Sequence, residues 1–223
     1  GMDAALGISD IPGKLENVVK GYVNPEEYFN LFRNSLLVQK ESHVWFRNKV
    51  VTVLDDHDQV RKGNSKARFC AQDERWKKLA ATVLSFNVLT MGIPCIYYGT
   101  EQCFDGEGGN DRYLRESMFG AEFGAFRSKN RHFFDENNLT FRTFSEVLTV
   151  RNDPKHLPLR RGRQYLREIS GDGYQFGYPK IFSGRMLSIV PWSRIFSDRE
   201  YLCAINTDTD DYRSAWVIVD RSL

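Results

Sequence analysis

The residues whose side chains could best take part in a reaction or bind a polar ligand follow an apolar, β-branched run at 50–54. That run ends abruptly in Asp55, Asp56, His57 and Asp58. Such a run is typical of a strand buried on both faces of a parallel sheet, and in α/β folds the functional groups lie at the carboxyl ends of such strands. Carboxylates there can stabilise a developing positive charge, and with the imidazole they can hydrogen-bond a polar substrate. The sequence therefore predicts a functional site at this strand end.

The pattern occurs a second time at 92–98, where an apolar run ends in the turn residue Gly99, followed by Glu101 and Gln102. These two polar residues either line the same cleft as the first cluster or hydrogen-bond the Gly99 turn, and the sequence does not separate the two alternatives. In the same way, one of the two aspartates that open the first cluster could serve only to cap the following loop.

Together, and in this order, the two segments resemble the α-amylase clan, glycoside hydrolase family 13. In that family one strand ends in Phe-Val-Asp-Asn-His-Asp, and the next reads Gly-x-Pro-x-Ile-Tyr-Tyr-Gly-x-Glu. Residues 53–58 read Val-Leu-Asp-Asp-His-Asp, so Asp56 stands where the family usually has Asn. Residues 92–101 match the second pattern without departure.

The resemblance implies a role for each polar residue. By resemblance, Asp58 is the catalytic-site carboxylate that grips ring hydroxyls and stabilises an oxocarbenium-like transition state, and His57 hydrogen-bonds the same sugar. Asp56, Glu101 and Arg115 are the further candidates for substrate binding. In the family, an acid-and-arginine segment similar to the one around Arg115 lies near the cleft, although an ion-pair network that only braces this loop is an equal alternative.

Two catalytic groups of the family have no counterpart in the chain. A retaining glycosidase needs a nucleophile and an acid/base, and neither the Gly-x-Arg-x-Asp pattern nor a strand-ending Glu occurs before residue 50. The resemblance implies that both precede this chain in a missing N-terminal half. We therefore expect part of a retaining enzyme acting on α-glucosidic bonds, inactive by itself and with no metal or cofactor. The alternative is an inert, self-associating fragment that binds carbohydrate weakly at most.

The order of the expected elements favours an α/β fold. Spacing and capping signals predict helices and strands in the order helix 13–20, helix 24–36, strand 50–55, helix 73–88, strand 93–98 and helix 139–151. This alternation is typical of a parallel sheet. After Gly171, short alternating runs separated by turn signals indicate antiparallel strands. We expect a polar loop at 63–72 and a long irregular segment at 103–138.

By resemblance, residues 1–162 are the C-terminal part of a TIM (β/α)8 barrel, comprising strands six to eight with their helices. Residues 163–223 are then a small antiparallel β-sandwich domain that need not be complete. Cys95 is expected to pack inside its strand as a small apolar side chain. Trp192 and Trp216 are each either buried in the sandwich or a platform for sugar.

Composition excludes several other classes. The formal net charge is +2 with both signs interspersed, so there is no basic block that would bind nucleic acid. No run is long and apolar enough for a membrane span. The four cysteines show no metal-binding spacing, and they slightly favour a reducing, cytoplasmic setting. The expected partners are an α-glucan or oligosaccharide substrate, together with a second copy or the missing half.

Overall fold

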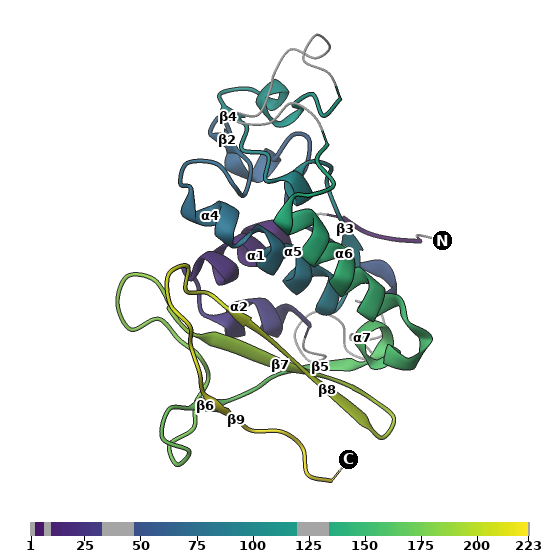
Figure 1. The fold of residues 1–223 in the computed structure, drawn as a ribbon, viewed down its shortest axis with the longest axis vertical. Coiled ribbons are helices and arrows are strands. Elements are labelled where there is room, and N and C mark those ends of the chain that lie inside the picture. The colour runs from purple at the N-terminus through teal and green to yellow at the C-terminus, as the bar shows by residue number, and fades with distance from the viewer. Residues whose placement is uncertain (1–2, 7–9, 33–46, 120–133, 223) are drawn as a thin grey trace.

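Three backbone segments run side by side in the same direction and form the parallel part of the fold. The computed structural model describes residues 3–6, 10–32, 47–119 and 134–222 (Figure 1). Strand β1 (Val51–Val53) pairs in parallel with β3 (Ile93–Cys95). Ala5 forms a parallel bridge to Val50 on the other side of β1. The expectation of parallel strands connected through helices is therefore confirmed for this part of the chain.

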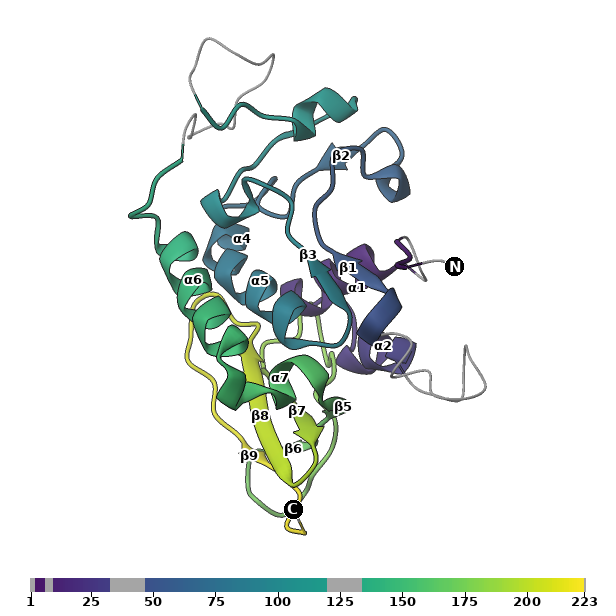
Figure 2. The same ribbon diagram turned by 90° about the vertical axis from the view of Figure 1, so that its right-hand side faces the viewer.

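Helices surround these strands (Figure 2). They are α1 (Ile11–Lys20), α2 (Pro25–Phe29), α4 (Arg75–Lys78), α5 (Ala80–Leu89), α6 (Leu139–Asn152) and α7 (Pro158–Arg161). Helix α5 connects β1 to β3 along the chain and packs against α6. Helix α1 ends at Gly21, which has φ 79°. A Cβ there would lie 2.6 Å from the Met186 carbonyl oxygen, so both the turn and the close approach favour glycine.

The C-terminal residues form two antiparallel sheets. One has the order β5-β7-β8, with β5 (Arg163–Leu166), β7 (Ile189–Phe196) and β8 (Arg199–Asn206); the other pairs β6 (Ile169–Ser170) with β9 (Trp216–Val217). A further pair, β2 (Lys66–Ala67) and β4 (Glu107–Gly108), lies beyond the carboxyl ends of the parallel strands, at the opposite end from β5, β7 and β8 (Figure 2). Antiparallel structure after residue 171 is as expected, whereas the domain division at 163 stays a prediction.

Side chains from both parts meet in one core. Trp192 of β7 is fully buried, and its ring lies 5.1 Å from that of Phe86 in α5 and 6.2 Å from that of Phe29 in α2. Of the two alternatives for the tryptophans, Trp192 is therefore a core residue, while Trp216 is 65% exposed. The apolar stripe expected in the helix at 73–88 is also buried, including Trp76 and Val83.

Several expectations were wrong in detail. The helix expected over 24–36 ends at Phe29 and continues as a 3-10 turn, Asn30–Phe32, while its last four residues lie outside the described residues. The polar loop expected at 63–72 has a buried half, because Arg68 and Phe69 turn inward. Cys95 is exposed rather than packed inside its strand, because none of the described residues covers the face of β3 from which its side chain projects.

Within the described residues, none of the helices has both the length and the apolar character needed to cross a bilayer.

Candidate active site

The turn after β1 presents His57 and Asp58 to solvent. Strand β1 is buried, and the chain turns as soon as the polar residues begin. The His57 Nε2 and Asp58 Oδ2 atoms lie 3.5 Å apart, with 63% and 39% of the two side chains exposed. The structure therefore brings together the imidazole and the carboxylate that the sequence singled out, and it leaves both accessible to a ligand.

Asp56 holds the shape of this turn. Its Oδ1 accepts hydrogen bonds from the backbone N–H of Asp58, at 2.9 Å, and of Gln59. Burial alone would raise the pKa of Asp56, but these two backbone donors lower it. The loop-capping alternative is thus observed at this oxygen, and substrate binding by Asp56 stays a prediction.

The carboxyl groups of Asp56 and Asp58 also affect each other directly. The protonated Asp58 carboxyl donates a hydrogen bond to the Asp56 carboxylate, which raises the pKa of Asp58; slight burial and the charge of Asp56 add to the effect, while His57 opposes it. The two groups titrate as a pair, with Asp56 losing its proton first. Asp58 is therefore the member of the pair that holds a proton to higher pH.

Asp55, by contrast, is a structural residue. It is 2% exposed and accepts hydrogen bonds from the Phe69 backbone N–H at 2.9 Å, from Thr100 Oγ1 at 3.0 Å and from Gln59 Nε2 at 3.3 Å. Burial raises the pKa of its carboxyl. These bonds fasten the end of β1 to the segment after β2 and to the turn after β3.

Glu101 lies in the 3-10 turn Thr100–Gln102 that follows β3. Burial raises the pKa of the Glu101 carboxyl, and backbone hydrogen bonds at Gly99 and at Glu101 itself oppose that rise. Gln102 exchanges two hydrogen bonds with the backbone of Asp135, at 3.1 and 3.2 Å. The turn-bonding alternative therefore describes Glu101, whereas the Gln102 side chain bonds the Asp135 backbone rather than the Gly99 turn. A contact of Glu101 with substrate stays a prediction.

Arg115 reaches the candidate site from the irregular segment after β3. Its Nε donates a 3.1 Å hydrogen bond to the carbonyl oxygen of His57, and its guanidinium lies 3.9 Å from the Asp111 carboxylate. Asp111 also pairs with Lys66 at 3.1 Å. These contacts are those of a bracing network, which is the alternative that the sequence left open. Because 52% of the Arg115 side chain is exposed, it also remains accessible.

Two supporting residues escaped the sequence analysis. Lys66 donates to the carbonyl oxygens of Asp58 and Gln59 and so fixes the far side of the turn. Arg68 is completely buried and pairs with the buried Glu116. Both basic residues lie in a stretch whose composition indicates only a solvated loop, so no local pattern marks them.

The Arg68–Glu116 pair ties together the loops around the site. The Arg68 guanidinium donates to the carbonyl oxygens of Tyr98 and Leu114, at 2.8 and 3.0 Å. Glu116 accepts from the Gly106 backbone N–H at 2.8 Å. Burial raises the pKa of Glu116 to about 7, against the lowering effect of Arg68.

One atom each from Asp56, His57 and Asp58 could serve as a metal ligand, because the three atoms lie within 4.8 Å of one another. One Asp56 oxygen is already occupied by two backbone donors. The absence of a metal requirement stays a prediction.

No protein-family model matches the chain, and no curated protein matches it. Similar solved structures do exist. An Anoxybacillus α-amylase is 18% identical, with a TM-score of 0.56 over 89% of this chain and 35% of its own. The γ-CGTase of alkalophilic Bacillus clarkii is also 18% identical, with a TM-score of 0.54 over 88% and 23%. A Geobacillus thermoleovorans α-amylase, solved with acarbose, is 15% identical, with a TM-score of 0.53 over 88% and 35%. The chain has the fold of part of an α-amylase-type enzyme.

The chain spans only about a quarter to a third of the length of these α-amylase-type enzymes. Their likeness agrees with the resemblance carried by residues 53–58 and 92–101, which are the ends of the two paired parallel strands. The motif residues and the backbone thus indicate the same fold.

Proposed function

We propose that this chain is the C-terminal part of an α-amylase-like glycoside hydrolase that acts on α-glucosidic bonds with retention of configuration. Residues 1–162 supply strands six to eight of a (β/α)8 barrel with their helices, and residues 163–223 form the β-sandwich domain that follows. The observation that carries the proposal is the accessible His57–Asp58 pair at the carboxyl end of β1, on a backbone shared with α-amylase-type enzymes.

Asp58 is the transition-state-stabilising carboxylate in this proposal. Cleavage of a glycosidic bond develops positive charge on the sugar ring, and a fixed carboxylate lowers the energy of that state. Asp56 and Lys66 hold the turn from both sides, so the carboxylate needs little reorganisation when the charge develops. The elevated pKa of Asp58 means that this function weakens as the pH falls toward that pKa.

The other substrate contacts are assigned by position. His57 hydrogen-bonds a hydroxyl of the same sugar, since its ring is exposed beside Asp58. Arg115 orients the His57 backbone and faces the substrate with its exposed guanidinium. Asp56 and Glu101 are less direct candidates, because their carboxyls already bond backbone groups. The nucleophile and the acid/base belong to an N-terminal half that lies outside residues 1–223.

Binding and turnover by the purified chain test the proposal. Acarbose and maltotriose are titrated calorimetrically into the wild type, Asp58→Asn and a matched control, Asp198→Asn, whose carboxyl is exposed in the turn between β7 and β8. We expect weak binding, reduced about tenfold by Asp58→Asn and unchanged by Asp198→Asn. No reducing sugar should be released from maltooligosaccharides by any of the three.

Three outcomes would contradict the proposal. If the wild type binds neither acarbose nor maltotriose, the proposed carbohydrate-binding function is wrong. Equal binding by Asp58→Asn would remove Asp58 from the site. Release of reducing sugar by the wild type, lost in Asp58→Asn, would place the nucleophile and the acid/base inside residues 1–223.

One observation favours the second candidate, an inert chain that associates with itself. Strand β3 has no second neighbour among the described residues, and Cys95 is exposed on it. Free strand edges associate readily unless they are covered. Sedimentation of the chain at several concentrations distinguishes a stable dimer, in which this edge is paired, from a monomer that requires the missing half.

A further inference from the structure

A cavity of about 450 Å³ lies where helix α7, strand β5 and the end of strand β7 meet. Its volume falls within the range of small-ligand sites, about 300–1,000 Å³. Arg47 precedes β1, whereas His57 and Asp58 follow it, so the cavity lies at the opposite end of the parallel strands from the candidate active site (Figure 2). The lining consists of three arginines and four other residues, which are Arg47, Arg161, Arg163, Tyr165, Ile195, Phe196 and Ser197.

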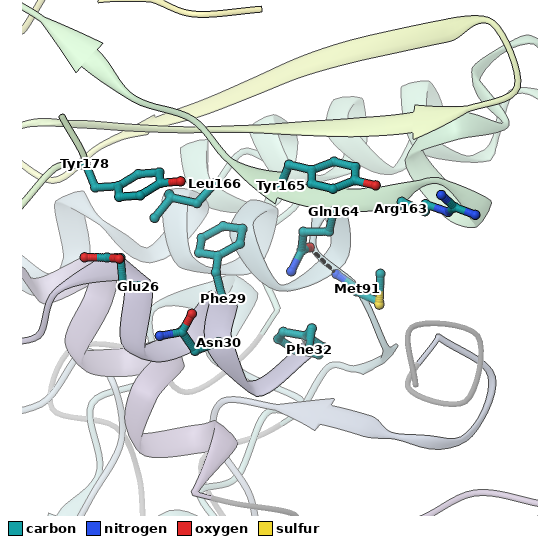
Figure 3. A pocket seen from close by; sticks show the side chains of 10 residues that line it. All are labelled: Glu26, Phe29, Asn30, Phe32, Met91, Arg163, Gln164, Tyr165, Leu166 and Tyr178. Carbon is teal, nitrogen blue, oxygen red and sulfur yellow. Dashed lines mark hydrogen bonds between the residues drawn. The ribbon is translucent and has the colours of Figure 1, made fainter. Parts of the chain in front are cut away.

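Strand β5 directs two of its side chains toward this cavity. Side chains alternate between the faces of a strand, so Arg163 and Tyr165 share one face and Gln164 lies on the other. Figure 3 shows Gln164 turned toward Met91, from whose backbone N–H it accepts a 2.7 Å hydrogen bond, and the Arg163 guanidinium directed away from it. In the antiparallel register Arg163 lies opposite Ile195 of β7, which places these two side chains side by side.

The backbone between the first two cavity arginines of this region is held in place. Arg47 Nη1 donates a 2.8 Å hydrogen bond to the carbonyl oxygen of Arg161, and Arg194 Nη2 donates a 3.0 Å hydrogen bond to that of Gly162. A Cβ at residue 162 would lie 2.9 Å from the Ile195 backbone nitrogen, so glycine lets the chain run directly against β7. The guanidinium groups on either side of Gly162 therefore project from a fixed backbone.

The charges that line the cavity are all positive. The lining holds three guanidinium groups and no carboxylate, and among the described residues none of the three forms an ion pair. Glu200 of the neighbouring strand is already bound by Arg167 at 2.6 Å and by the Asp220 backbone N–H at 2.9 Å. Asp198, in the turn after β7, does not line the cavity. An uncompensated group of cations in a concave site attracts an anion.

Further positive charge lies behind the cavity wall. The Arg194 side chain is only 1% exposed, and its guanidinium bonds backbone carbonyls. Burial lowers the pKa of Arg194 to about 10, and the nearby charges of Arg151 and Arg47 add to this lowering, while Cys203 opposes it. The region around the cavity is thus crowded with cations, and an anion bound there would reduce their mutual repulsion.

The rest of the lining indicates which anion fits. Tyr165, Ile195 and Phe196 supply an aromatic ring and apolar side chains, and Tyr165 is 42% and Phe196 38% exposed. Guanidinium forks bind the oxygens of carboxylates and phosphates. A phosphate monoester has about −1.5 to −2 charges at pH 7 and three acceptor oxygens, so three arginines suit it better than a singly charged carboxylate. A free phosphate ion would leave the apolar wall uncovered.

We propose that this cavity binds a small phosphate monoester whose organic group is aromatic or apolar. Arg47, Arg161 and Arg163 bind the phosphate oxygens, and the aromatic and apolar side chains of the lining contact the organic group. The site is separate from the strand end that carries His57 and Asp58, and it does not depend on the function proposed for that end.

Phenyl phosphate is the probe for this site. It is titrated calorimetrically into the whole chain at about 0.15 M salt, where diffuse attraction to surface charges is screened beyond about 8 Å. We expect one saturable site per chain. Phenol, which has the ring without the charge, should not bind, and inorganic phosphate, which has the charge without the ring, should bind more weakly than phenyl phosphate.

Two variants and two controls locate the binding. Arg161→Gln and Arg163→Gln each remove one charge from an exposed side chain, so the fold should be unaffected. We expect each to weaken the binding of phenyl phosphate about tenfold. Arg142→Gln, at an exposed position of α6 outside the lining, changes the net charge equally and should leave the affinity unchanged. Asp58→Asn should also have no effect, which separates the cavity from the candidate active site.

Several results would overturn the proposal. Without saturable binding of phenyl phosphate to the wild type, there is no such site. If Arg142→Gln weakens binding as much as Arg163→Gln does, the attraction is that of the whole surface. If inorganic phosphate binds as tightly as phenyl phosphate, the apolar wall contributes nothing. If single-stranded RNA binds and phenyl phosphate does not, the arginines form a polyanion-binding surface instead. Circular dichroism establishes that each variant is folded.

Discussion

Thr100 Oγ1 donates a 3.0 Å hydrogen bond to Oδ2 of Asp55, and both residues are buried. Thr100 begins the turn after β3, and Asp55 begins the turn after β1. One hydrogen bond therefore joins the carboxyl ends of two parallel strands that are far apart in the sequence. The side chains expected to act on substrate emerge directly from the turn that this bond anchors.

Thr100→Val should weaken this anchor. The substitution keeps the shape of the side chain but leaves the Asp55 carboxylate oxygen buried without its donor. We expect the free energy of unfolding to fall by about 1–3 kcal/mol, measured by urea denaturation. Thr143→Val on α6 is the control and should change it by less than about 0.5 kcal/mol. Equal effects of the two substitutions would show that the Thr100–Asp55 bond contributes nothing specific.

Glu16 should control stability in acid. Its carboxylate lies 2.8 Å from Lys20 Nζ, 2.6 Å from Arg61 and 3.2 Å from Lys62. Burial would raise its pKa, but these cations together lower it to about 2. A carboxyl whose pKa is lowered by folding stabilises the fold at pH values above its unfolded-state pKa of 4.5. This stabilisation is lost as the pH falls toward 2. It amounts to about 3 kcal/mol.

Urea unfolding of the wild type and Glu16→Gln at several pH values measures the stabilisation that Glu16 provides. The wild type should be the more stable at pH 7 by about 3 kcal/mol, and the difference should shrink as the pH falls toward 2. The exposed Glu136→Gln serves as the control and should show no such convergence. A constant difference between wild type and Glu16→Gln at all pH values would contradict the assigned cause.

The buried Arg68–Glu116 pair should contribute strongly to the stability of the protein, because it joins the loops around the site. Arg68→Met leaves the Glu116 carboxylate buried without its cation, and we expect a loss of about 3–5 kcal/mol in the free energy of unfolding. The double variant Arg68→Met/Glu116→Leu should recover part of that loss, because it removes both charges. If the double variant is no more stable than Arg68→Met alone, the two residues do not act as a pair.

The cysteines should differ sharply in reactivity toward iodoacetamide. Cys95 is exposed, whereas Cys70 is buried, and a hydrogen bond with Cys103, together with burial, raises the pKa of the Cys70 thiol. Burial also raises the pKa of Cys203 to about 11. Mass spectrometry after brief labelling of the native chain should find Cys95 modified first, and Cys95→Ser should abolish the fast phase. Protection of Cys95 would indicate that a second copy covers β3.

The sequence predicted those parts of the fold that depend on local patterns. The β-branched run before Asp55 marked β1, and the Asn-Pro pair marked the start of α2. The placement of His57 beside Asp58 at an exposed strand end followed from the same run. Such features depend on residues close together in the chain. The pattern of apolar and polar residues and the residues that cap helices therefore predict them directly.

What the sequence could not predict depends on distant partners. Arg68 reads as a loop residue, and its burial is set by Glu116 and by the carbonyls of Tyr98 and Leu114. The apolar run around Cys95 predicts a core residue, and its exposure depends on what packs against its face of β3. Neither outcome has a local signal, since each follows from tertiary contacts formed after the elements are in place.

Strand β7 stabilises the end of helix α5 as well as the core. Trp192 Nε1 and the Arg194 guanidinium both donate to the carbonyl oxygen of Leu89, the last residue of α5, at 3.3 and 2.8 Å. The C-terminal sheet thus caps the helix that connects β1 to β3. A sheet exchanged from another protein would have to supply the same indole and guanidinium, so the C-terminal region is not a module that can be freely swapped. For the same reason, the chain should melt in a single cooperative heat-capacity peak.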